Sequence, residues 1–356
     1  MSYVLRTFIL LLLTASKPLF ALSALEAKID SMVQTAMQEN HIPGLALAVV
    51  QNAQPLLIKG YGNAQLKPSR PVSTKTLFAI GSISKVYTAF AIMELVQEGK
   101  VGLDDSILKY LPKAPAAWRA VTIRELLSHT SGIPQHQGPH LPWQRVWQQL
   151  AKRPMQFAPG TNTRYNNFGF IVLGRVIEQV SGQSLASYFQ TTIFNPLNLS
   201  QTGFPATLNP PGLADGFHFV NGKYVPAPNR KPWQQMWGSG GIVSNIEDMA
   251  KWDMAMSAGK ILSPQTYLQM WRPVTLINGQ PSGRNGLFWS LGWQVSYRNN
   301  KLVAQKDGAI RGYSSFIIRH IDDQVSIILL TNTNKVRLPR LAKQIFQAVK
   351  GIETTQ

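Results

Sequence analysis

Several absences narrow what this chain of 356 residues can be. It has no cysteine, which excludes disulfides, thiolate metal sites and a cysteine-linked lipid anchor. It has only 17 acidic residues against 35 lysines and arginines, so its formal net charge is +18. The N-terminal apolar run at residues 8–14 is too short to cross a membrane. No low-complexity run or linker divides the chain, so we expect a folded core of ordinary composition.

The first residues are typical of a secretory signal. Arg6 supplies a positive start, an apolar run follows, and Ala21-Leu22-Ser23 offers small residues for cleavage near Ala24. We therefore expect a signal peptide over residues 1–23 and export to the periplasm or exterior of a bacterial envelope, with no transmembrane span after processing. Lys17-Pro18 is atypical of such a signal, and a retained anchor is the alternative.

The excess of positive charge attracts polyanions through long-range fields. In an envelope these are anionic lipid head groups and cell-wall polymers, so an anionic envelope surface is a candidate partner. The basic residues near the C-terminus are Lys335, Arg337, Arg340 and Lys343. Nucleic acid is not an expected partner, because no nucleic-acid-binding module is recognisable and the signal indicates export. A solvated basic surface explains the charge equally well.

The most informative motif is Ser82-Ile83-Ser84-Lys85. A serine and a lysine three positions apart lie on one face of a helix, and the apolar approach ending at Gly81 predicts that a helix begins here. A serine hydroxyl becomes nucleophilic when a neighbouring base takes its proton, and a desolvated lysine crowded by positive charge can be that base. The motif alone is weak, because the chain contains it at Ser82/Lys85, Ser106/Lys109 and Ser257/Lys260.

A second segment carries side chains that complement Ser82. Tyr165 and Asn167 lie on a loop at the start of a helix predicted over residues 168–178. A tyrosine hydroxyl near two ammonium groups can have a lowered pKa and relay protons. The asparagine amide can bind a substrate amide through its donor and its acceptor.

A third segment, Lys306-Asp307-Gly308-Ala309, lies between two predicted strands. On an edge strand, Gly308 would let a substrate backbone come close. The backbone N–H groups of Ala309 and Ser82 would then form an oxyanion hole around one acyl oxygen. Lys306 would supply positive charge for a substrate carboxylate.

The ordered set Ser-x-x-Lys, Tyr-x-Asn and Lys-x-Gly resembles the penicillin-recognising serine hydrolases. The branch it is most similar to holds class C β-lactamases, DD-peptidases and their esterase relatives. Connecting segments also resemble this family, namely residues 126–134, 195–199 and 240–244. The resemblance runs from about residue 29 to the C-terminal helix, which is nearly the whole mature chain.

The resemblance implies a role for each motif residue. Ser82 would be the acyl-forming nucleophile and Lys85 its base partner. Tyr165 would activate the deacylating water or protonate the leaving group. The residues implied in substrate binding are Asn167, Lys306 and Gly308.

One residue departs from the family pattern. Many lactamases and DD-peptidases of the family have Thr or Ser between the lysine and the glycine of the third motif, and its hydroxyl binds the substrate carboxylate. Here the residue is Asp307, which would repel a carboxylate if it faces the cleft. Arg311, close behind, would restore carboxylate binding. The departure weakens a β-lactamase interpretation more than it weakens that of a serine acyl hydrolase.

The predicted architecture is α+β: an antiparallel sheet flanked by N- and C-terminal helices, with an inserted, mainly helical lobe, as in β-lactamases and transpeptidases. Helices are predicted at residues 25–38 and 338–349, a hairpin over 45–61, and strands within 289–331. After the signal, one hydrolase domain would span residues 24–350, with an α/β lobe of about 24–87 and 257–350, a helical lobe of about 88–256, and a tail of 351–356. The motifs would converge between the lobes.

Three hypotheses of function follow. The first is an exported serine acyl hydrolase acting on a β-lactam or a D-Ala-D-Ala-type peptide amide. The second is a small-ester carboxylesterase of the same family, and the third is a penicillin-binding or sensor module that deacylates slowly. No cofactor or metal is expected, because the six histidines show no ligand spacing. His129 is expected to be a structural hydrogen-bonding residue.

Overall fold

The structure is a computed structural model that describes residues 22–136, 142–228, 236–334 and 336–353. Almost all of the predicted signal segment, residues 1–23, lies outside this part, and so does Lys335. The chain divides into two compact units, one made of the segments up to Ile42 and from Val336, the other of Pro43–Lys335. The lobe boundaries near residues 87 and 256 stay a prediction.

The smaller unit holds the two terminal helices. One spans residues 22–39, and the other is α9 (Leu338–Glu353). Both predicted terminal helices are therefore confirmed. Their buried residues recur every three or four positions, as in an amphipathic helix: Leu25, Ile29 and Val33, then Leu338, Leu341 and Ile345. No helix in the described part of the chain is both long and apolar enough to span a membrane.

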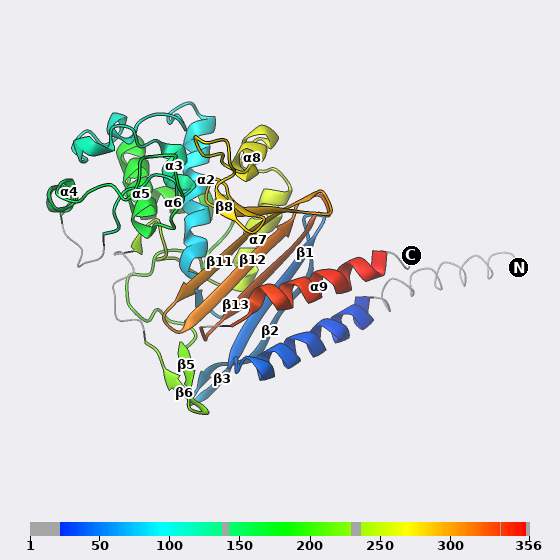
Figure 1. The fold of residues 1–356 in the computed structure, drawn as a ribbon. Helices are drawn as coiled ribbons and strands as arrows, with labels where there is room; N and C mark the ends of the chain where they lie inside the picture. The colour runs from blue at the N-terminus through cyan, green and yellow to red at the C-terminus, as the bar shows by residue number, and fades with distance from the viewer. Residues whose placement is uncertain (1–21, 137–141, 229–235, 335, 354–356) are drawn as a thin grey trace, which may run out of the picture. The chain divides into compact units, whose positions relative to one another are not determined.

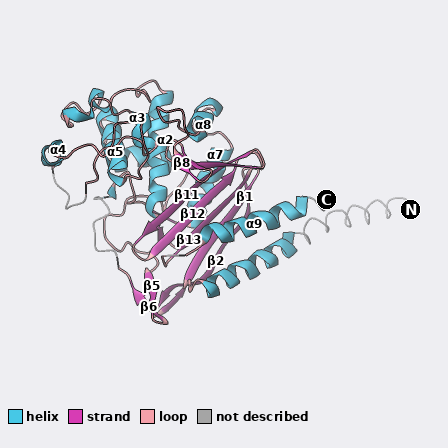
Figure 2. Ribbon diagram, in the orientation of Figure 1, coloured by secondary structure: helices cyan, strands magenta, loops and turns pink. Residues whose placement is uncertain are grey.

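The larger unit is built on one antiparallel sheet of nine strands (Figures 1 and 2). Its order is β3-β2-β1-β13-β12-β11-β10-β9-β8. The strands are β1 (Gly44–Gln51), β2 (Gln54–Leu66), β3 (Ser69–Pro71), β8 (Gly283–Arg284), β9 (Leu287–Trp289), β10 (Gln294–Arg298), β11 (Lys301–Ile310), β12 (Tyr313–His320) and β13 (Val325–Thr331). The predicted α+β class is confirmed, and Leu45 of β1 pairs with Thr331 of β13.

The helices described in the larger unit all lie between β3 and β8 in the chain. They are α2 (Ser84–Gln97), α3 (Ile123–Leu127), α4 (Trp143–Ala151), α5 (Asn167–Ser181), α6 (Leu185–Phe189), α7 (Ile246–Ser257), α8 (Pro264–Trp271), the 3₁₀ turns η1 (Gly81–Ile83), η2 (Ile107–Lys109) and η3 (Ala116–Trp118), and the π-helical η4 (Gln190–Phe194). Two short antiparallel pairs complete the unit, β4 (Phe78–Ala79) with β7 (Val243–Ser244) and β5 (Phe217–Val220) with β6 (Lys223–Pro226).

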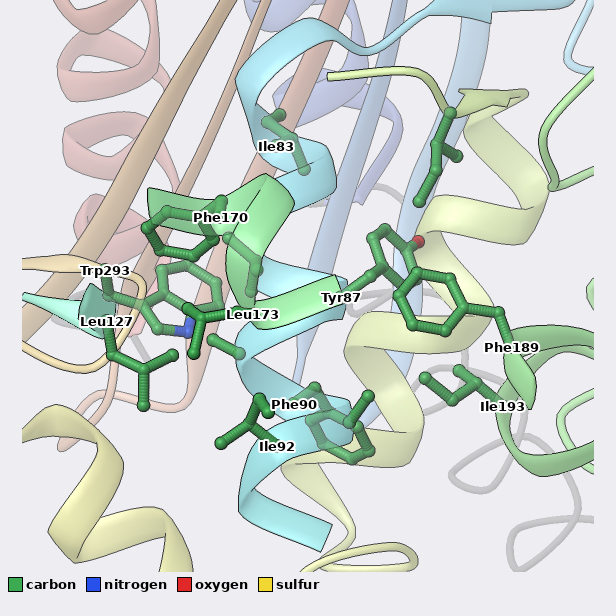
Figure 3. Packing of buried hydrophobic residues seen from close by; sticks show 14 of the residues in the cluster. Ile83, Tyr87, Phe90, Ile92, Leu127, Phe170, Leu173, Phe189, Ile193 and Trp293 are labelled. Carbon is green, nitrogen blue, oxygen red and sulfur yellow. The ribbon is translucent and has the colours of Figure 1, made fainter. Parts of the chain in front are cut away.

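Helix α2 is the centre of the core. It is buried on every side rather than on one stripe, which is typical of a helix surrounded by other elements. Figure 3 shows Tyr87 and Phe90 of α2 among Phe170 of α5, Phe189 and Trp293. The Tyr87 ring also stacks on Trp252 of α7 with ring centroids 4.3 Å apart. This packing fixes the end of α2 at which Ser82 lies.

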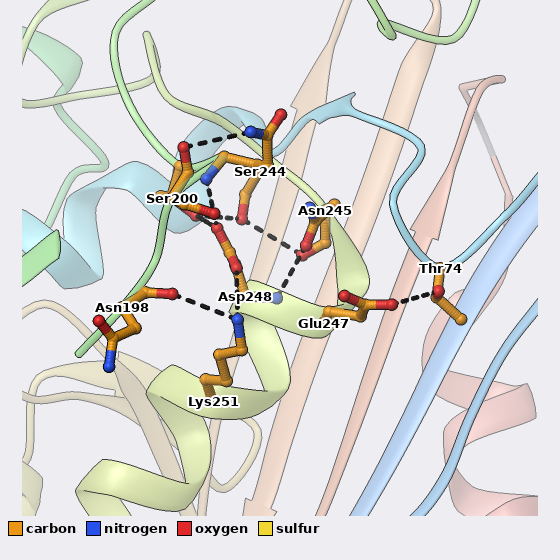
Figure 4. Close-up of polar contacts among 10 residues, drawn as sticks. Thr74, Asn198, Ser200, Ser244, Asn245, Glu247, Asp248 and Lys251 are labelled. Carbon is orange, nitrogen blue, oxygen red and sulfur yellow. Dashed lines mark hydrogen bonds and ion pairs between the residues drawn. The ribbon is translucent and has the colours of Figure 1, made fainter. Parts of the chain in front are cut away.

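A polar network anchors the start of α7 (Figure 4). The Asn245 side chain caps the helix by accepting the Asp248 N–H at 2.8 Å. Asp248 Oδ2 in turn accepts the Gln201 N–H at 2.8 Å, and Glu247 accepts a hydrogen bond from Thr74. Strand β7, which leads into α7, pairs with β4, and β4 ends shortly before Ser82. The network therefore holds in place the strand pair that precedes Ser82.

Candidate active site

Ser82 lies in η1, the 3₁₀ turn that leads directly into α2 at Ser84. The turn requires Gly81, whose φ of +53° is strained for residues with a side chain. A Cβ atom at this glycine would lie 2.9 Å from the Ala309 nitrogen, which is too close for a real contact. The absence of a side chain at Gly81 thus brings β11 against the turn that carries Ser82.

Lys85 lies directly beside Ser82 and is fully buried. Its Nζ donates to Ser82 Oγ at 3.1 Å, to Asn167 Oδ1 at 2.8 Å and to the Ser239 carbonyl oxygen at 2.6 Å. Burial lowers the pKa of Lys85 well below its ordinary value, and the positive charge of Lys306 lowers it further. The direction agrees with the sequence-based expectation for a lysine that acts as a base.

Tyr165 completes a chain of three polar groups. Its hydroxyl lies 2.6 Å from Ser82 Oγ, and its ring faces two amines, with Lys85 Nζ at 5.0 Å and Lys306 Nζ at 5.2 Å from the centroid. Burial raises the pKa of Tyr165 above its ordinary value, and the charge of Asp307 raises it further. The expected lowering of this pKa was therefore wrong, because the cost of burying a phenolate dominates in the free site.

Lys306 is 1% exposed, in spite of its charge. Its Nζ lies 5.2 Å from the Tyr165 ring centroid and 5.1 Å from that of Trp289, distances typical of cation–π contacts. Burial lowers the pKa of Lys306 to about 8, while the charge of Asp307 opposes the shift. The Lys306 amine is therefore mostly charged at neutral pH, and it becomes neutral as the pH rises through about 8.

The second half of β11 has an open edge. β10 pairs only with Lys301–Gln305, so residues 306–310 have no strand partner on that side among the residues that the structure describes. Toward β12, Ile310 pairs with Tyr313 across a two-residue turn, and hydrogen-bonded pairs alternate along an antiparallel ladder. The Ala309 N–H therefore points away from β12. This direction suits the predicted oxyanion hole, whose second donor would be the Ser82 N–H.

Gly308 packs against the backbone of Ile80, whereas from the sequence we expected it to face a substrate backbone. A side chain here would collide with the Ile80 carbonyl oxygen and with Ser315 Oγ, which donates to that same oxygen at 2.8 Å. The glycine therefore permits a close approach to the protein's own backbone before Ser82, and its contact with a substrate stays a prediction. Gly308 supports the site by letting β11 and η1 pack together.

Asp307 lies on the other face of β11. Side chains alternate along a strand, so Lys306 and Gly308 point inward while Asp307 is exposed. Its charge nevertheless raises the pKa values of Lys85, Lys306 and Tyr165. The carboxylate is thus a fixed negative charge within electrostatic reach of the site.

The structure brings together the predicted residues and separates the other copies of the first motif. Ser82, Lys85, Tyr165 and Asn167 are joined by hydrogen bonds. Ser106 instead caps η2, and Ser257 accepts a hydrogen bond from Arg319. The catalytic roles of the gathered residues stay a prediction.

Sequence reasoning missed one contributor to the site. The Ser239 carbonyl oxygen is a backbone group, so no side-chain pattern announces it, although the glycines that follow it at 240 and 241 indicate a close-packed loop. Trp289, one of several tryptophans that the sequence offers as candidates for packing or for lining the cleft, forms one wall around Lys306. In the part of the chain that the structure describes, His, Asp and Glu side chains form no cluster suited to a metal ion.

The chain is similar to several known proteins. The sequence model of the family "Beta-lactamase" matches residues 29–350. The chain is 28% identical over 329 residues to Penicillin-binding protein 4* of Bacillus subtilis, covering 85% of this chain and 71% of that protein. It is 25% identical over 333 residues to Protein flp of Staphylococcus aureus, covering 90% of this chain. The chain spans 66% of the length of that relative.

A solved structure shows the same fold. The β-lactamase/D-alanine carboxypeptidase from Pseudomonas syringae superposes with a TM-score of 0.78 at 22% sequence identity. The superposition covers 91% of this chain and 99% of that one. At this identity the likeness concerns the fold alone.

Replacing Gly308 with alanine tests the contact between β11 and η1. We expect Gly308→Ala to destabilise the protein by roughly 1–3 kcal/mol, because the added methyl group overpacks the contact with Ile80. Urea unfolding measures this. Gly203→Ala is the matched control, since a Cβ there meets no atom within 4 Å. Equal stability of the two variants would contradict the proposed contact.

Proposed function

Because the chain belongs to the Beta-lactamase family, the penicillin-recognising serine hydrolases, we propose that it is a hydrolase that forms an acyl-enzyme on Ser82. One observation carries the proposal. Ser82 Oγ lies within hydrogen-bonding distance of Tyr165 Oη, at 2.6 Å, and of Lys85 Nζ, at 3.1 Å. A nucleophile in contact with both a base and an acid is the arrangement that acyl transfer requires.

In the proposed acylation, Ser82 Oγ attacks the acyl carbon and its proton passes to neutral Lys85. The developing oxyanion is held by the N–H groups of Ser82 and Ala309. When the bond to the leaving group breaks, Tyr165 donates its O–H proton to the departing nitrogen or oxygen. The raised pKa of Tyr165 supports this role, because it keeps the phenol protonated in the free enzyme.

Deacylation reverses these proton transfers. A water molecule attacks the acyl carbon and gives its proton to the Tyr165 phenolate. Ser82 Oγ then leaves and takes back the proton held on Lys85. Each residue returns to its starting protonation state, so the cycle consumes one water and needs no cofactor.

We propose a β-lactam or a D-Ala-D-Ala-type peptide amide as the substrate. Both carry a carboxylate near the reacting amide, and the buried Lys306 amine offers a positive charge close to Tyr165. The relative named Penicillin-binding protein 4* supports this choice. Export to the envelope, where such peptides occur, and contact with an anionic envelope surface belong to the same proposal.

A small ester is the second candidate substrate, and Asp307 favours it. The exposed carboxylate stands where family members that bind a carboxylate have Thr or Ser. Because Asp307 lies on the other face of β11, it acts on a substrate carboxylate only through its long-range charge, and a neutral ester is free of that effect.

Intact-mass spectrometry after brief incubation with a fluorescent penicillin tests the proposal. We expect a penicilloyl adduct on the wild type and none on Ser82→Ala, because Ser82 carries the hydroxyl that contacts Lys85 and Tyr165. An adduct that decays within the assay indicates turnover, whereas a persistent one indicates a slowly deacylating penicillin-binding or sensor module. No adduct, together with hydrolysis of p-nitrophenyl acetate that the variant lacks, would assign an esterase. Inactivity in both assays would contradict the hydrolase proposal.

The dependence of kcat/KM on pH follows from the two lysines. On the acidic side, activity should rise with pH as Lys85 loses its proton, at a pKa well below the ordinary lysine value. On the basic side, kcat/KM for a penicillin should fall through about pH 8, where Lys306 becomes neutral. A neutral ester should show the acidic limb without the basic one. Identical profiles for both substrates would contradict carboxylate binding by Lys306.

Replacing Asp307 tests its effect on substrate choice. We expect Asp307→Thr to raise kcat/KM for carboxylate-bearing substrates by no more than about fivefold, because Asp307 lies on the other face of β11 and a like charge even about 4 Å away costs only about 1 kcal/mol in a water-like medium. Hydrolysis of p-nitrophenyl acetate is the internal control and should change little. A similar change for both substrates would show that Asp307 does not discriminate by charge.

A further inference from the structure

His129 lies beside Tyr165 and has no part in the proton transfers proposed above. It is 1% exposed, and its ring centroid lies 4.5 Å from those of both Tyr165 and Trp289. Its φ of +60° falls in the left-handed region, where His, Asn and Asp are the commonest residues after glycine. A residue held in this unfavourable conformation needs contacts that maintain it.

His129 forms hydrogen bonds with both residues next to Tyr165 in the sequence, Arg164 and Asn166. The His129 carbonyl oxygen accepts the Arg164 N–H at 2.9 Å, and the ring Nδ1 accepts the Asn166 N–H at 3.1 Å. Gln135 adds a third bond, from its Nε2 to the Tyr165 carbonyl oxygen at 3.1 Å. The backbone on either side of Tyr165 is thus tied to one residue of another segment.

The protonation state of the ring suits this contact. A backbone N–H only donates, so Nδ1 is the bare nitrogen and the proton lies on Nε2. Nε2 has no hydrogen-bond partner among the described residues, which leaves the bond to Asn166 as the only one the ring makes there. Burial and the charges of Lys306 and Lys85 lower the pKa of His129 well below its ordinary value, which preserves the acceptor.

We infer that His129 is a positioning residue, which holds Tyr165 Oη against Ser82 Oγ through the backbone on both sides of the tyrosine. This inference rests on the proposed function, in which Tyr165 exchanges protons with the leaving group and the water. Because Tyr165 reaches Ser82 at the end of a long side chain, a shift of its backbone displaces the hydroxyl from the 2.6 Å contact.

Three substitutions separate the acceptor from the backbone conformation. His129→Leu removes the acceptor. His129→Asn supplies an oxygen near the place of Nδ1 and tolerates the positive φ. His129→Gly also tolerates the φ and lacks the acceptor, so it replaces the leucine variant if that variant fails to fold.

The rate of acyl-adduct formation at Ser82 tests the inference. We expect His129→Leu to lower it on the order of 10²-fold, the effect of misplacing a reacting group by about 1 Å. His129→Asn should restore most of the rate. In a Tyr165→Phe background, His129→Leu should cause no further loss, because a residue that acts only through the Tyr165 hydroxyl has nothing left to position. Additive losses, or an asparagine variant as slow as the leucine variant, would overturn the inference.

Hydrogen exchange gives a readout that does not depend on activity. The amides of residues 164–168 should exchange faster in His129→Leu than in the wild type, and at nearly the wild-type rate in His129→Asn. Unchanged exchange in the leucine variant would overturn the inference even if the rates fall. If the wild type forms no adduct and hydrolyses no substrate, the proposed function fails, and the exchange data still test the contact between His129 and the tyrosine loop.

Discussion

The buried amine of Lys85 is the constraint on which the site depends. An amine removed from water needs an acceptor for each of its protons, because an unpaired buried donor costs about 1–3 kcal/mol or more. Lys85 finds three acceptors, on Ser82, Asn167 and Ser239, which come from η1, α5 and the loop before β7. Satisfying one lysine therefore fixes the relative positions of three segments that are far apart in the sequence.

The same three acceptors accommodate both protonation states of the amine. Carbonyl oxygens only accept, so the bonds to Asn167 and Ser239 keep their direction when Lys85 becomes neutral. The Ser82 hydroxyl can both donate and accept, so it is the one partner whose bond can reverse. In the neutral state the lone pair of Lys85 points at the serine proton. Proton transfer then needs no movement of the surrounding groups, and this preorganisation lowers the barrier.

Much of this arrangement could be predicted from the sequence, and the exceptions share a cause. The motifs around Ser82, Tyr165 and Lys306 mark helix starts and a strand, so local patterns were sufficient to place them. Within residues 289–331, where strands are predicted, residues 290–293 instead separate β9 from β10. Gly308 faces Ile80, and the pKa of Tyr165 rises rather than falls. These features depend on backbone groups and burial contributed by distant segments, which no local pattern encodes.

Burial also explains why a chain of net charge +18 can hold three basic side chains around one tyrosine. Desolvation pushes the pKa values of Lys85, Lys306 and His129 downward, so the free site carries much less charge than its composition indicates. In the proposed cycle, charge develops only on acylation, when Lys85 gains a proton and Tyr165 loses one. The two opposite charges then stabilise each other in a medium of low dielectric. Lys306 and the exposed carboxylate of Asp307 would therefore determine whether the site prefers a charged or a neutral substrate.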